Sequence, residues 1–333
     1  MIRTAAELEN LATEVLMKAG TAEPAAASVA RALVRANRDG LSSHGLARLK
    51  AYSAQAAVGK VNGAAIPQMD NLGPAAARID AGDGFAFPAF DLAIDTIETM
   101  TEASPIAGVA ITNSHHFGVA GHHVERLAER GIVGLVFGNS PAGIAPWGGS
   151  LPLFGTNPIA FGFPRSDDSP VVIDLSLSKQ ARGKIKLAAE QGRPIPEGWA
   201  LDADGNPTTD AAAAMGGSML PLGDAKGAAL VLGVEIMAAA MTGAHFGYEA
   251  SSFFDDKGGP PRVGQFLLGF RPGPLSGGTY NERIEVLLGA VLEQPGTRLP
   301  GARRLGNREA ADRDGIDIPD DLITWMEAAA GVG

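Results

Sequence analysis

The chain has 333 residues and a formal net charge of −10, with 44 glycines, 22 prolines and no cysteine. The negative charge argues against nucleic acid and anionic membranes as partners, and the lack of cysteine excludes disulfides, thiolate nucleophiles and zinc–thiolate sites. No apolar run approaches the roughly 18 residues of a membrane span, and the N-terminus has no signal-peptide pattern. We therefore expect a cytoplasmic protein with two or three domains.

The N-terminal part of the chain is predicted to be helical and Ala-rich. Thr4 and Glu7 have the spacing of a capping box, and Gly20 suits the end of the helix that follows. Thr21 is expected to cap a second helix that carries Pro24 in its first turn. The three predicted helices span residues 4–18, 21–38 and 43–59.

After residue 60, short apolar runs alternate with helical patterns, which is typical of an α/β or α+β domain. Strands are predicted at residues 76–80, 108–112, 134–138, 159–163, 171–175 and 263–270. Helices are predicted at residues 89–103, 119–129, 180–191, 228–242, 280–292 and 319–330. Residues 194–210 and 297–308 are predicted to be loops, the second of them basic, and the last helix is expected to pack against the N-terminal helices.

The start of the predicted third helix is the best candidate for chemistry. Ser42 and Ser43 have the character of an N-cap pair, which would place His44 in the first turn. Arg48 lies four residues further on and would share the same helix face. The helix N-terminus would disfavour the imidazolium, and the guanidinium fork suits a substrate carboxylate. Each of these side chains could instead have an ordinary surface role, because such motifs carry false positives.

A second candidate segment, residues 113–121, follows a predicted strand and opens a helix, a position that suits a cofactor phosphate. His115 and His116 could pack on a cofactor ring or donate a hydrogen bond to it. His122 and His123 are interpreted as a solvated helix face. A metal site built from these four histidines lacks a carboxylate at a metal-ligand spacing.

Other candidates are weaker. The nearest match to G-x-G-x-x-G, at residues 82–87, fails at its last position, and no Walker A motif is present. Thr156 could contact a substrate or only satisfy its own turn, and Asp174 could orient a histidine, bind a ribose hydroxyl or cap the next segment. Lys226 could reach a phosphate. The basic residues of the loop near the C-terminus, which would suit a phosphate including a 2′-phosphate, are Arg298, Arg303 and Arg304.

Taken together, these motifs resemble the malate/L-lactate dehydrogenase family of non-Rossmann NAD(P)-dependent oxidoreductases, whose relatives include Δ1-piperideine-2-carboxylate reductase and ureidoglycolate dehydrogenase. The motif D-G-L-S-S-H-G-L-A-R at residues 39–48, with Tyr52, carries the resemblance first. Further matching segments, in chain order, are residues 113–118, 155–162, 195–202, 207–210, 226–227 and 298–301.

The resemblance implies an α/β (α+β) fold with two domains and a homodimer whose active sites lie near the subunit interface. Residues 66–279 would form a non-Rossmann domain on a largely antiparallel mixed sheet that binds the cofactor and the substrate. Residues 1–65 and 280–333 would form a helical domain.

By similarity, His44 is the proton donor and Ser43 its relay partner, while Arg48, Thr156 and His116 contact the substrate. The positions implied to bind NAD or NADP are His116, Phe117, Gly118, Val119, Ala120, Asp174, Leu175, Ser176, Arg182, Gly183, Lys226, Gly301, Ala302, Arg303 and Arg304. Asp174 and Glu190 are both candidates for a carboxylate that completes the relay in some relatives.

The chain departs from many relatives at residues 174–178, which read D-L-S-L-S instead of D-x-A-T-S, and at residues 223–226, where a second glycine and an aromatic are frequent. Both segments touch the cofactor region, so NAD and NADP both remain open.

Three functions can be compared. The first is hydride transfer between a nicotinamide and C2 of a small 2-oxo or 2-hydroxy acid, with cyclic 2-imino acids (Δ1-piperideine-2-carboxylate and Δ1-pyrroline-2-carboxylate) as alternative substrates. The second is a metal-dependent hydrolase that uses the histidine pairs, although no metal ligands are predicted. The third is a non-catalytic relative that binds ligands, which the presence of His44 and Arg48 disfavours.

Overall fold

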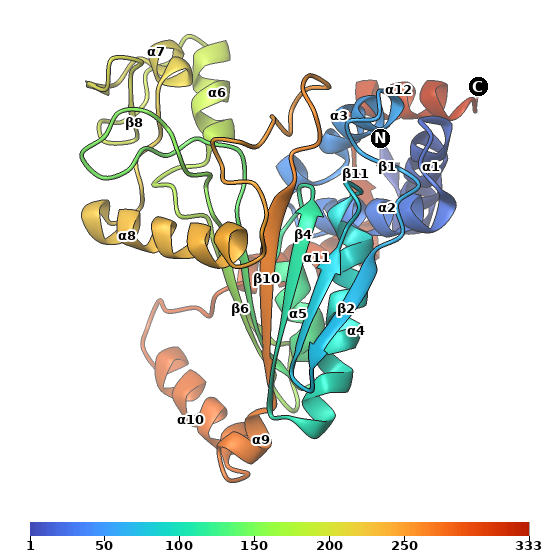
Figure 1. Ribbon diagram of the computed structural model, residues 1–333, viewed down its shortest axis with the longest axis vertical. Coiled ribbons are helices and arrows are strands. Elements are labelled where there is room, and N and C mark those ends of the chain that lie inside the picture. Colours follow the sequence, from blue (N-terminus) through green and yellow to red (C-terminus); the bar gives the residue numbers. More distant parts are fainter. Residues whose placement is uncertain (333) are drawn as a thin grey trace.

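A mixed seven-stranded sheet lies at the centre of residues 1–332, the part of the chain that the computed structural model describes (Figure 1). All neighbouring strands are antiparallel except β3 and β4, so the predicted largely antiparallel mixed sheet is confirmed. In spatial order the strands are β2 (Gln68–Gly73), β3 (Ala76–Asp80), β4 (Ile106–Ser114), β10 (Val263–Phe270), β5 (Val133–Gly138), β6 (Ile159–Phe163) and β7 (Val171–Leu175).

The last long strand of the chain lies in the middle of this sheet. β10 pairs antiparallel with β4 on one side and with β5 on the other, so β4 and β5 run in the same direction. The helix α5 (Ala120–Glu129) connects them and begins just beyond the carboxyl end of β4. The N-terminus of α5, the end of a helix that favours negative charge, therefore lies at one end of the sheet.

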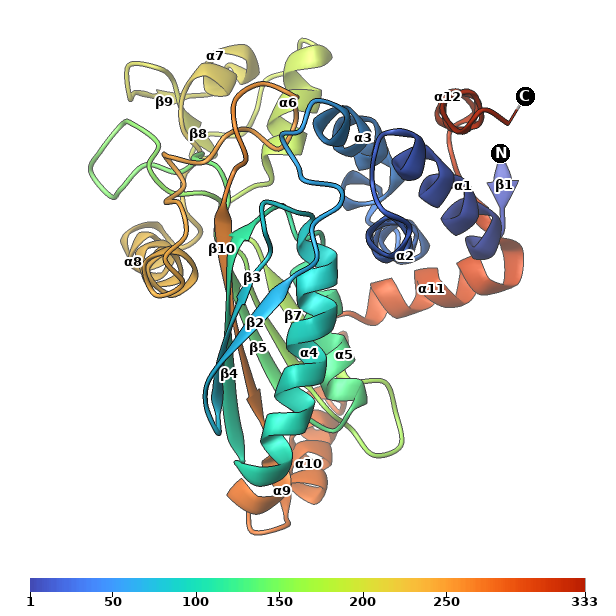
Figure 2. The same cartoon turned by 45° about the vertical axis from the view of Figure 1, so that its right-hand side comes forward.

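Helices cover the two faces of the sheet unequally. α4 (Ala86–Ala103) and α5 cover one face along its length (Figure 2), and alternate strand residues such as Val109 and Leu267 pack there against Phe90 and Val124. On the other side, α8 (Asp224–Glu235) continues as the π-helical turn η3 (Ile236–Ala240) and contacts β5 and β10.

Both ends of the chain form a helical layer beside the sheet, which confirms that the last helix packs on the N-terminal ones. Its apolar core joins Leu8, Leu33 and Tyr52 to Ile323 and Met326. The capping box of Thr4 and Glu7 is also confirmed. The elements of this layer are β1 (Ile2–Arg3), α1 (Ala5–Lys18), α2 (Glu23–Arg38), α3 (Leu49–Ala57), α11 (Ala302–Asp314), β11 (Ile316–Asp317) and α12 (Asp320–Ala330).

A third, smaller core lies beyond the end of the sheet, under the turn-rich segments of the chain. It includes Ile144, Leu177, Ile185 and Met219. Its regular elements are α6 (Arg182–Glu190), β8 (Ala200–Leu201), β9 (Pro207–Thr208) and α7 (Ala211–Gly216).

Several predicted elements differ from the structure. The predicted basic loop at residues 297–308 is wrong from Ala302 onward, because α11 begins there after Gly301, whose φ is +86°. α11 has no buried residue, so it lacks the apolar stripe that announces most helices. β2 is absent from the prediction because its side chains are polar or exposed. The N-cap of α2 is Ala22, not Thr21.

One predicted member of the helical domain lies elsewhere. α10 (Tyr280–Leu292) follows α9 (Pro272–Leu275) at the end of the sheet farthest from the terminal helices (Figure 1). Only Leu288 of α10 is buried, and it belongs to none of the three apolar cores. Separately, no helix within residues 1–332 has the length and apolar character needed to cross a bilayer.

Two buried carboxylates connect the helical layer to the sheet domain. Asp39, at the end of α2, and Glu125, on α5, have side chains that are 0% and 1% exposed. Arg308 of α11 contacts both oxygens of Asp39 at 2.8 Å and Glu125 at 3.0 Å. Arg304 bonds both carboxylates as well, and Arg35 of α2 donates to Glu125 at 2.6 Å.

These contacts lower both carboxyl pKa values. Burial opposes the shift, but hydrogen bonds from Arg304 and Arg308 bring the pKa of Glu125 to about 2. Burial likewise opposes the shift at Asp39, where hydrogen bonds from Arg308 and His122 hold the pKa well below its usual range. Removing one partner of such a buried pair leaves a charge without compensation.

We expect Arg308→Met to lower the free energy of unfolding by about 3 kcal/mol near neutral pH, measured by urea denaturation. The carboxyl pKa values are depressed in the folded state, so their stabilisation is complete above the unfolded value near 4 and is lost as the pH falls toward 2. The difference between wild type and variant should therefore shrink over that range. Arg313→Met, which breaks the exposed pair with Asp314, is the matched control and should leave the free energy of unfolding nearly unchanged. Equal losses for the two variants would contradict the assignment.

Candidate active site

The predicted proton donor lies in a pair of single 3-10 turns. η1 (Ser42–His44) and η2 (Leu46–Arg48) precede α3, so the predicted α-helix start at Ser43 is wrong. Gly45 separates the turns with an extended backbone, and a Cβ there would meet the Asn37 amide. That amide oxygen accepts the Leu46 N–H at 2.6 Å, which takes the place of the expected serine cap.

The predicted side chains nevertheless meet. The Ser43 hydroxyl lies 3.1 Å from Nδ1 of His44, and Arg48 donates Nε–H to the Ser43 carbonyl at 2.8 Å. Nε2 of His44 has no hydrogen-bond partner within residues 1–332. The two turns thus hold an imidazole and a guanidinium side by side, with one imidazole nitrogen left for a substrate.

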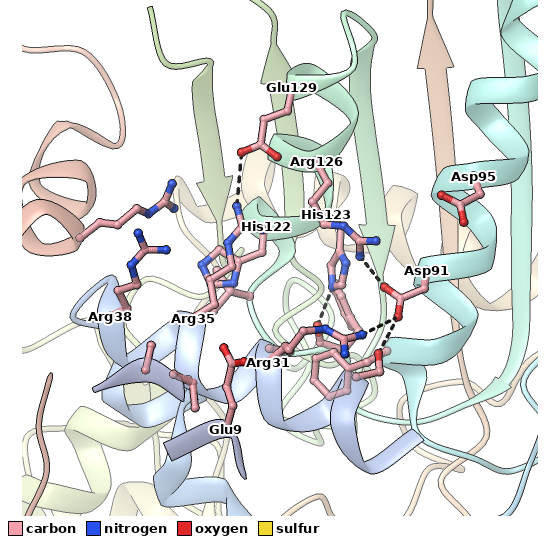
Figure 3. Close-up of a pocket in the computed structure, with 18 of the residues that line it drawn as sticks. Glu9, Arg31, Arg35, Arg38, Asp91, Asp95, His122, His123, Arg126 and Glu129 are labelled. Atoms are coloured by element: carbon pink, nitrogen blue, oxygen red, sulfur yellow. Dashed lines mark hydrogen bonds and ion pairs between the residues drawn. The ribbon is translucent and has the colours of Figure 1, made fainter. Parts of the chain in front are cut away.

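Arg48 differs from the other arginines near it. A cleft of about 660 Å³ between α2, α4 and α5 is lined by several arginines (Figure 3). Each of these arginines lies within ion-pair distance of a carboxylate. Arg126 bonds Asp91 at 2.7 Å, and Arg35 lies 3.8 Å from Glu129. The half-buried Arg48, outside this cleft, has no carboxylate within ion-pair distance in the part of the chain that the structure describes. A buried cation without a counterion is suited to an anionic ligand.

His116 forms the opposite wall of the site. Its ring stacks on His44 with centroids 5.7 Å apart, and its Nδ1 is bonded to the hydroxyl of the buried Tyr52. Burial raises the pKa of Tyr52, so this phenol keeps its proton and is able to donate it in the bond to Nδ1. In that arrangement the neutral His116 ring carries its own proton on Nε2.

All of these imidazoles favour the neutral form. Burial lowers the pKa of His44 to about 4, and the positive charges of Arg48 and His122 add to the shift. Burial also sets the pKa of His116 well below its usual range. The predicted direction for His44 is confirmed, but its cause is burial and nearby positive charge and not a helix N-terminus.

The structure brings together four of the segments that the sequence predicts to hold a cofactor or substrate. At the start of α5, the Gly121 N–H donates to the Asp174 carboxylate at 2.8 Å. The Thr156 carbonyl accepts the Leu177 N–H at 2.8 Å. Gly301 packs against the backbone of β7. These contacts join residues 117–121, 156, 174–177 and 301 around one end of the sheet.

Some of the remaining cofactor candidates are exposed, and others are hydrogen-bonded within the protein. Lys226, in the first turn of α8, and Arg303, in that of α11, are exposed and make no ion pair within the described residues. Gly183 of α6 and Ala302 of α11 are exposed as well. Arg304 is bonded to Glu125, and Arg182 donates to the Met215 carbonyl. Leu175 and Ser176 are exposed at the end of β7, whereas Gly118 opens toward α5 with φ +72°.

Side-chain burial limits what three of these positions can offer. Phe117 is 3% exposed and stacks on Phe90 with centroids 5.4 Å apart, so it can present only its backbone to a ligand. Val119 and Ala120 are buried as well.

The interpretation of His122 and His123 as a solvated face is wrong, because both are at most 5% exposed. His122 donates to Asp39 at 2.9 Å, and His123 donates to the Phe117 carbonyl at 2.8 Å. Polar residues on the buried face of α5 cannot be recognised without their distant partners. Within residues 1–332, no group of three or more His, Asp or Glu side chains is arranged to hold a metal ion.

Neither candidate for the relay carboxylate contacts His44. Asp174 accepts from Gly121, and Glu190 lies 3.8 Å from Lys186 on the surface of α6. The ring of His44 is bonded to Ser43 alone among the described residues.

Two aromatic residues of the site are absent from the prediction. Phe253 packs against His116 with centroids 5.2 Å apart, and Phe254 lies under the Arg48 guanidinium at 4.4 Å. The available signal was a pair of consecutive aromatics in a loop otherwise rich in Ser, Asp and Gly.

Comparison with known proteins adds independent findings. The family model described as malate/L-lactate dehydrogenase matches residues 4–327. The chain is 50% identical over 324 residues to (2R)-3-sulfolactate dehydrogenase (NADP(+)) of Chromohalobacter salexigens, covering 97% of this chain and 96% of that one. It is 38% identical over 330 residues to a Δ1-pyrroline-2-carboxylate/Δ1-piperideine-2-carboxylate reductase of Pseudomonas putida, covering 98% and 96%.

Solved structures agree with this grouping. The Δ1-piperideine-2-carboxylate reductase of Pseudomonas syringae superposes with a TM-score of 0.94 at 36% identity, covering 99% of both chains. The sulfolactate dehydrogenase of Methanocaldococcus jannaschii gives a TM-score of 0.91 at 28% identity, covering 99% of this chain and 97% of that one.

We expect the His44 ring to titrate near pH 4 in the free protein, because burial and the charge of Arg48 disfavour the imidazolium. Arg48→Met removes the charge and keeps the bulk, so the pKa of His44 should rise but stay below its ordinary value of 6.5. Two-dimensional NMR of histidine-labelled protein measures both values, and His44→Gln identifies the resonance. A midpoint near 6.5 in the wild type would show that the ring is not desolvated as described.

Proposed function

Because the chain belongs to the malate/L-lactate dehydrogenase family, we propose that it is an NAD(P)-dependent oxidoreductase that transfers hydride between the nicotinamide and C2 of a small 2-oxo or 2-hydroxy acid. The observation that carries this proposal is the unpaired Arg48 guanidinium beside the neutral His44 ring. An acid with a carboxylate next to its reacting carbon presents both an anion and a proton site at that spacing.

Each side chain has a defined task in this reaction. Arg48 binds the substrate carboxylate through its two Nη groups. In the direction of oxidation, Nε2 of His44 takes the proton of the C2 hydroxyl, and in reduction it returns that proton to the carbonyl oxygen. Ser43 holds Nδ1 of the same ring at 3.1 Å and so fixes its orientation. A bound nicotinamide supplies the hydride in reduction and accepts it in oxidation.

The residues at the end of the sheet fit a dinucleotide. The first turn of α11 has no side-chain cap, so its N–H groups can bind phosphate oxygens, whereas the Gly121 N–H in the first turn of α5 is already bonded to Asp174. We propose that the exposed Arg303 contacts the 2′-phosphate of NADP, which agrees with the cofactor named for the 50% identical relative. We propose that Asp174, bonded to Gly121 at the start of α5, contacts a ribose hydroxyl of the cofactor.

A cyclic 2-imino acid is the alternative substrate. The Pseudomonas relatives at 38% and 36% identity are named as reductases of such compounds. Arg48 would bind their carboxylate in the same way, and hydride would again be added at C2, with the proton retained on nitrogen. The higher identity to the sulfolactate enzyme leads us to place the hydroxy acid first.

A substrate panel tests the proposal. We expect purified protein to oxidise NADPH, followed at 340 nm, with one or more of sulfopyruvate, oxaloacetate, pyruvate and Δ1-pyrroline-2-carboxylate. NADPH should be used more efficiently than NADH if Arg303 binds the 2′-phosphate, and Arg303→Gln should reduce that preference.

His44→Ala is the matched test of the mechanism, and kcat should fall about 10²–10⁴-fold because the general acid is lost. Absence of turnover with every acid and both cofactors would reject the proposed function. Full turnover by His44→Ala would reject only the role of His44.

The cytoplasmic location that the sequence suggests stays a prediction.

We also propose that the protein is a homodimer. The sheet face away from α4 and α5 carries half-buried apolar side chains between β4 and β6, and exposed apolar residues of α8 and η3 extend it. A continuous apolar surface of this kind is typical of an interface between subunits. On the strands, its residues are Val133, Leu135, Phe163, Phe266, Leu268 and Phe270.

We expect the protein to sediment at twice the chain mass of 34.1 kDa, and Leu268→Lys to shift it toward the monomer. A buried lysine without a partner opposes association. Met17→Lys, on the remote α1, is the control and should leave the dimer intact. Wild type that sediments as a monomer at micromolar concentration would contradict the proposal.

A further inference from the structure

Two consecutive phenylalanines between η3 and β10 point in different directions. Phe253 is 5% exposed, and its ring lies 5.2 Å from both the His115 and the His116 rings. Phe254 is 63% exposed, yet its ring lies 4.4 Å below the Arg48 guanidinium carbon. The Phe253 ring therefore packs inside the wall of the site, whereas the Phe254 ring lies against the guanidinium of Arg48.

Lys60 and Gln55 of the helical layer bind the loop that contains Phe253 and Phe254. The Lys60 side chain is 0% exposed, and its ammonium donates to the carbonyls of Ser252, Asp255 and Lys257 at 2.7, 2.9 and 2.7 Å. Gln55 of α3 donates to the Asp255 carbonyl as well, at 2.8 Å. The Asp255 carboxylate lies 3.6 Å from the same ammonium. Moving the loop away would leave a buried ammonium without these acceptors, so the contacts favour this position of the loop.

Arg48 is constrained from two sides by these contacts. Its Nε–H is used by the Ser43 carbonyl, and one face of its plane lies over Phe254. Stacking on an aromatic face attracts the cation and excludes water from that side. The outer edge, with both Nη groups, is the part left without a partner among the described residues.

We propose that Phe254 is a positioning residue that holds the Arg48 fork in the plane needed to bind the substrate carboxylate, and that Lys60 fixes the loop for this purpose. The proposal rests on the proposed function, because it assigns the carboxylate to Arg48. Phe254 would act through Arg48 and would not contact the reacting atoms. A leucine at residue 254 fills similar space but has no π face.

The experiment compares Phe254→Leu with Phe254→Tyr, which keeps the aromatic face. Tyr248→Leu is the matched control, because Tyr248 is a 57% exposed aromatic of the same connection between η3 and β10 that stacks on Phe246. KM for the acid, KM for NADPH, kcat and the thermal midpoint are measured for each. Binding of oxamate, a pyruvate isostere that is not reduced, is measured by calorimetry in the presence of NADPH.

In Phe254→Leu we expect KM for the acid and Kd for oxamate to rise about tenfold, with KM for NADPH and the thermal midpoint unchanged. Phe254→Tyr and Tyr248→Leu should behave like the wild type. Lys60→Met should reproduce the rise if it folds. Equal oxamate binding by Phe254→Leu and the wild type would overturn the proposal, as would an equal loss in Tyr248→Leu.

The two proposals fail in distinguishable ways. If the wild type turns over no acid but Arg48→Met and Phe254→Leu both lose oxamate binding, the proposed function fails and the positioning role stands. If the wild type turns over an acid and Phe254→Leu has wild-type kinetics, only the positioning role fails.

Discussion

The pairing of Asp39 and Glu125 with arginines of α11 is the interaction on which the site depends. Asp39 ends α2 and lies five residues before His44, Glu125 lies one turn after the start of α5, and Arg304 and Arg308 belong to the first half of α11. Three segments that are remote in sequence are thereby fixed relative to one another. His44 and the start of α5 are supported by the same buried charges, so neither can move far without the other.

The proposed chemistry depends on Arg48, which has no carboxylate partner among residues 1–332. The other half-buried arginines of the helical layer are paired with carboxylates, whereas Arg48 is held only by a carbonyl and an aromatic ring. Burial, together with the uncompensated charge of Arg48, keeps the adjacent His44 neutral. A neutral base beside a cation without a counterion is suited to a substrate that carries a negative charge. The same arrangement would be of little use with an uncharged ketone.

The sequence allowed the strands at residues 159–163 and 171–175 to be predicted to the residue, because Pro158 and Pro164 bound the first apolar run and Pro170 precedes the second. It also placed His44 beside Arg48, although Gly45 breaks the expected helix. What it could not reveal depends on distant partners. α11 is held by charges on α2 and α5, His122 is buried by Asp39, 83 residues away, and Phe254 meets Arg48 across 206 residues. Local patterns contain no trace of such pairings.

The central place of β10 has a consequence for synthesis on the ribosome. Until residues 263–270 emerge, β4 and β5 each expose an unpaired edge, and these edges flank a gap one strand wide. Nascent chains of this kind are open to pairing with strands of other chains. The sheet can therefore close only after four-fifths of the polypeptide has been made, and fragments that stop earlier should require chaperones to remain dispersed.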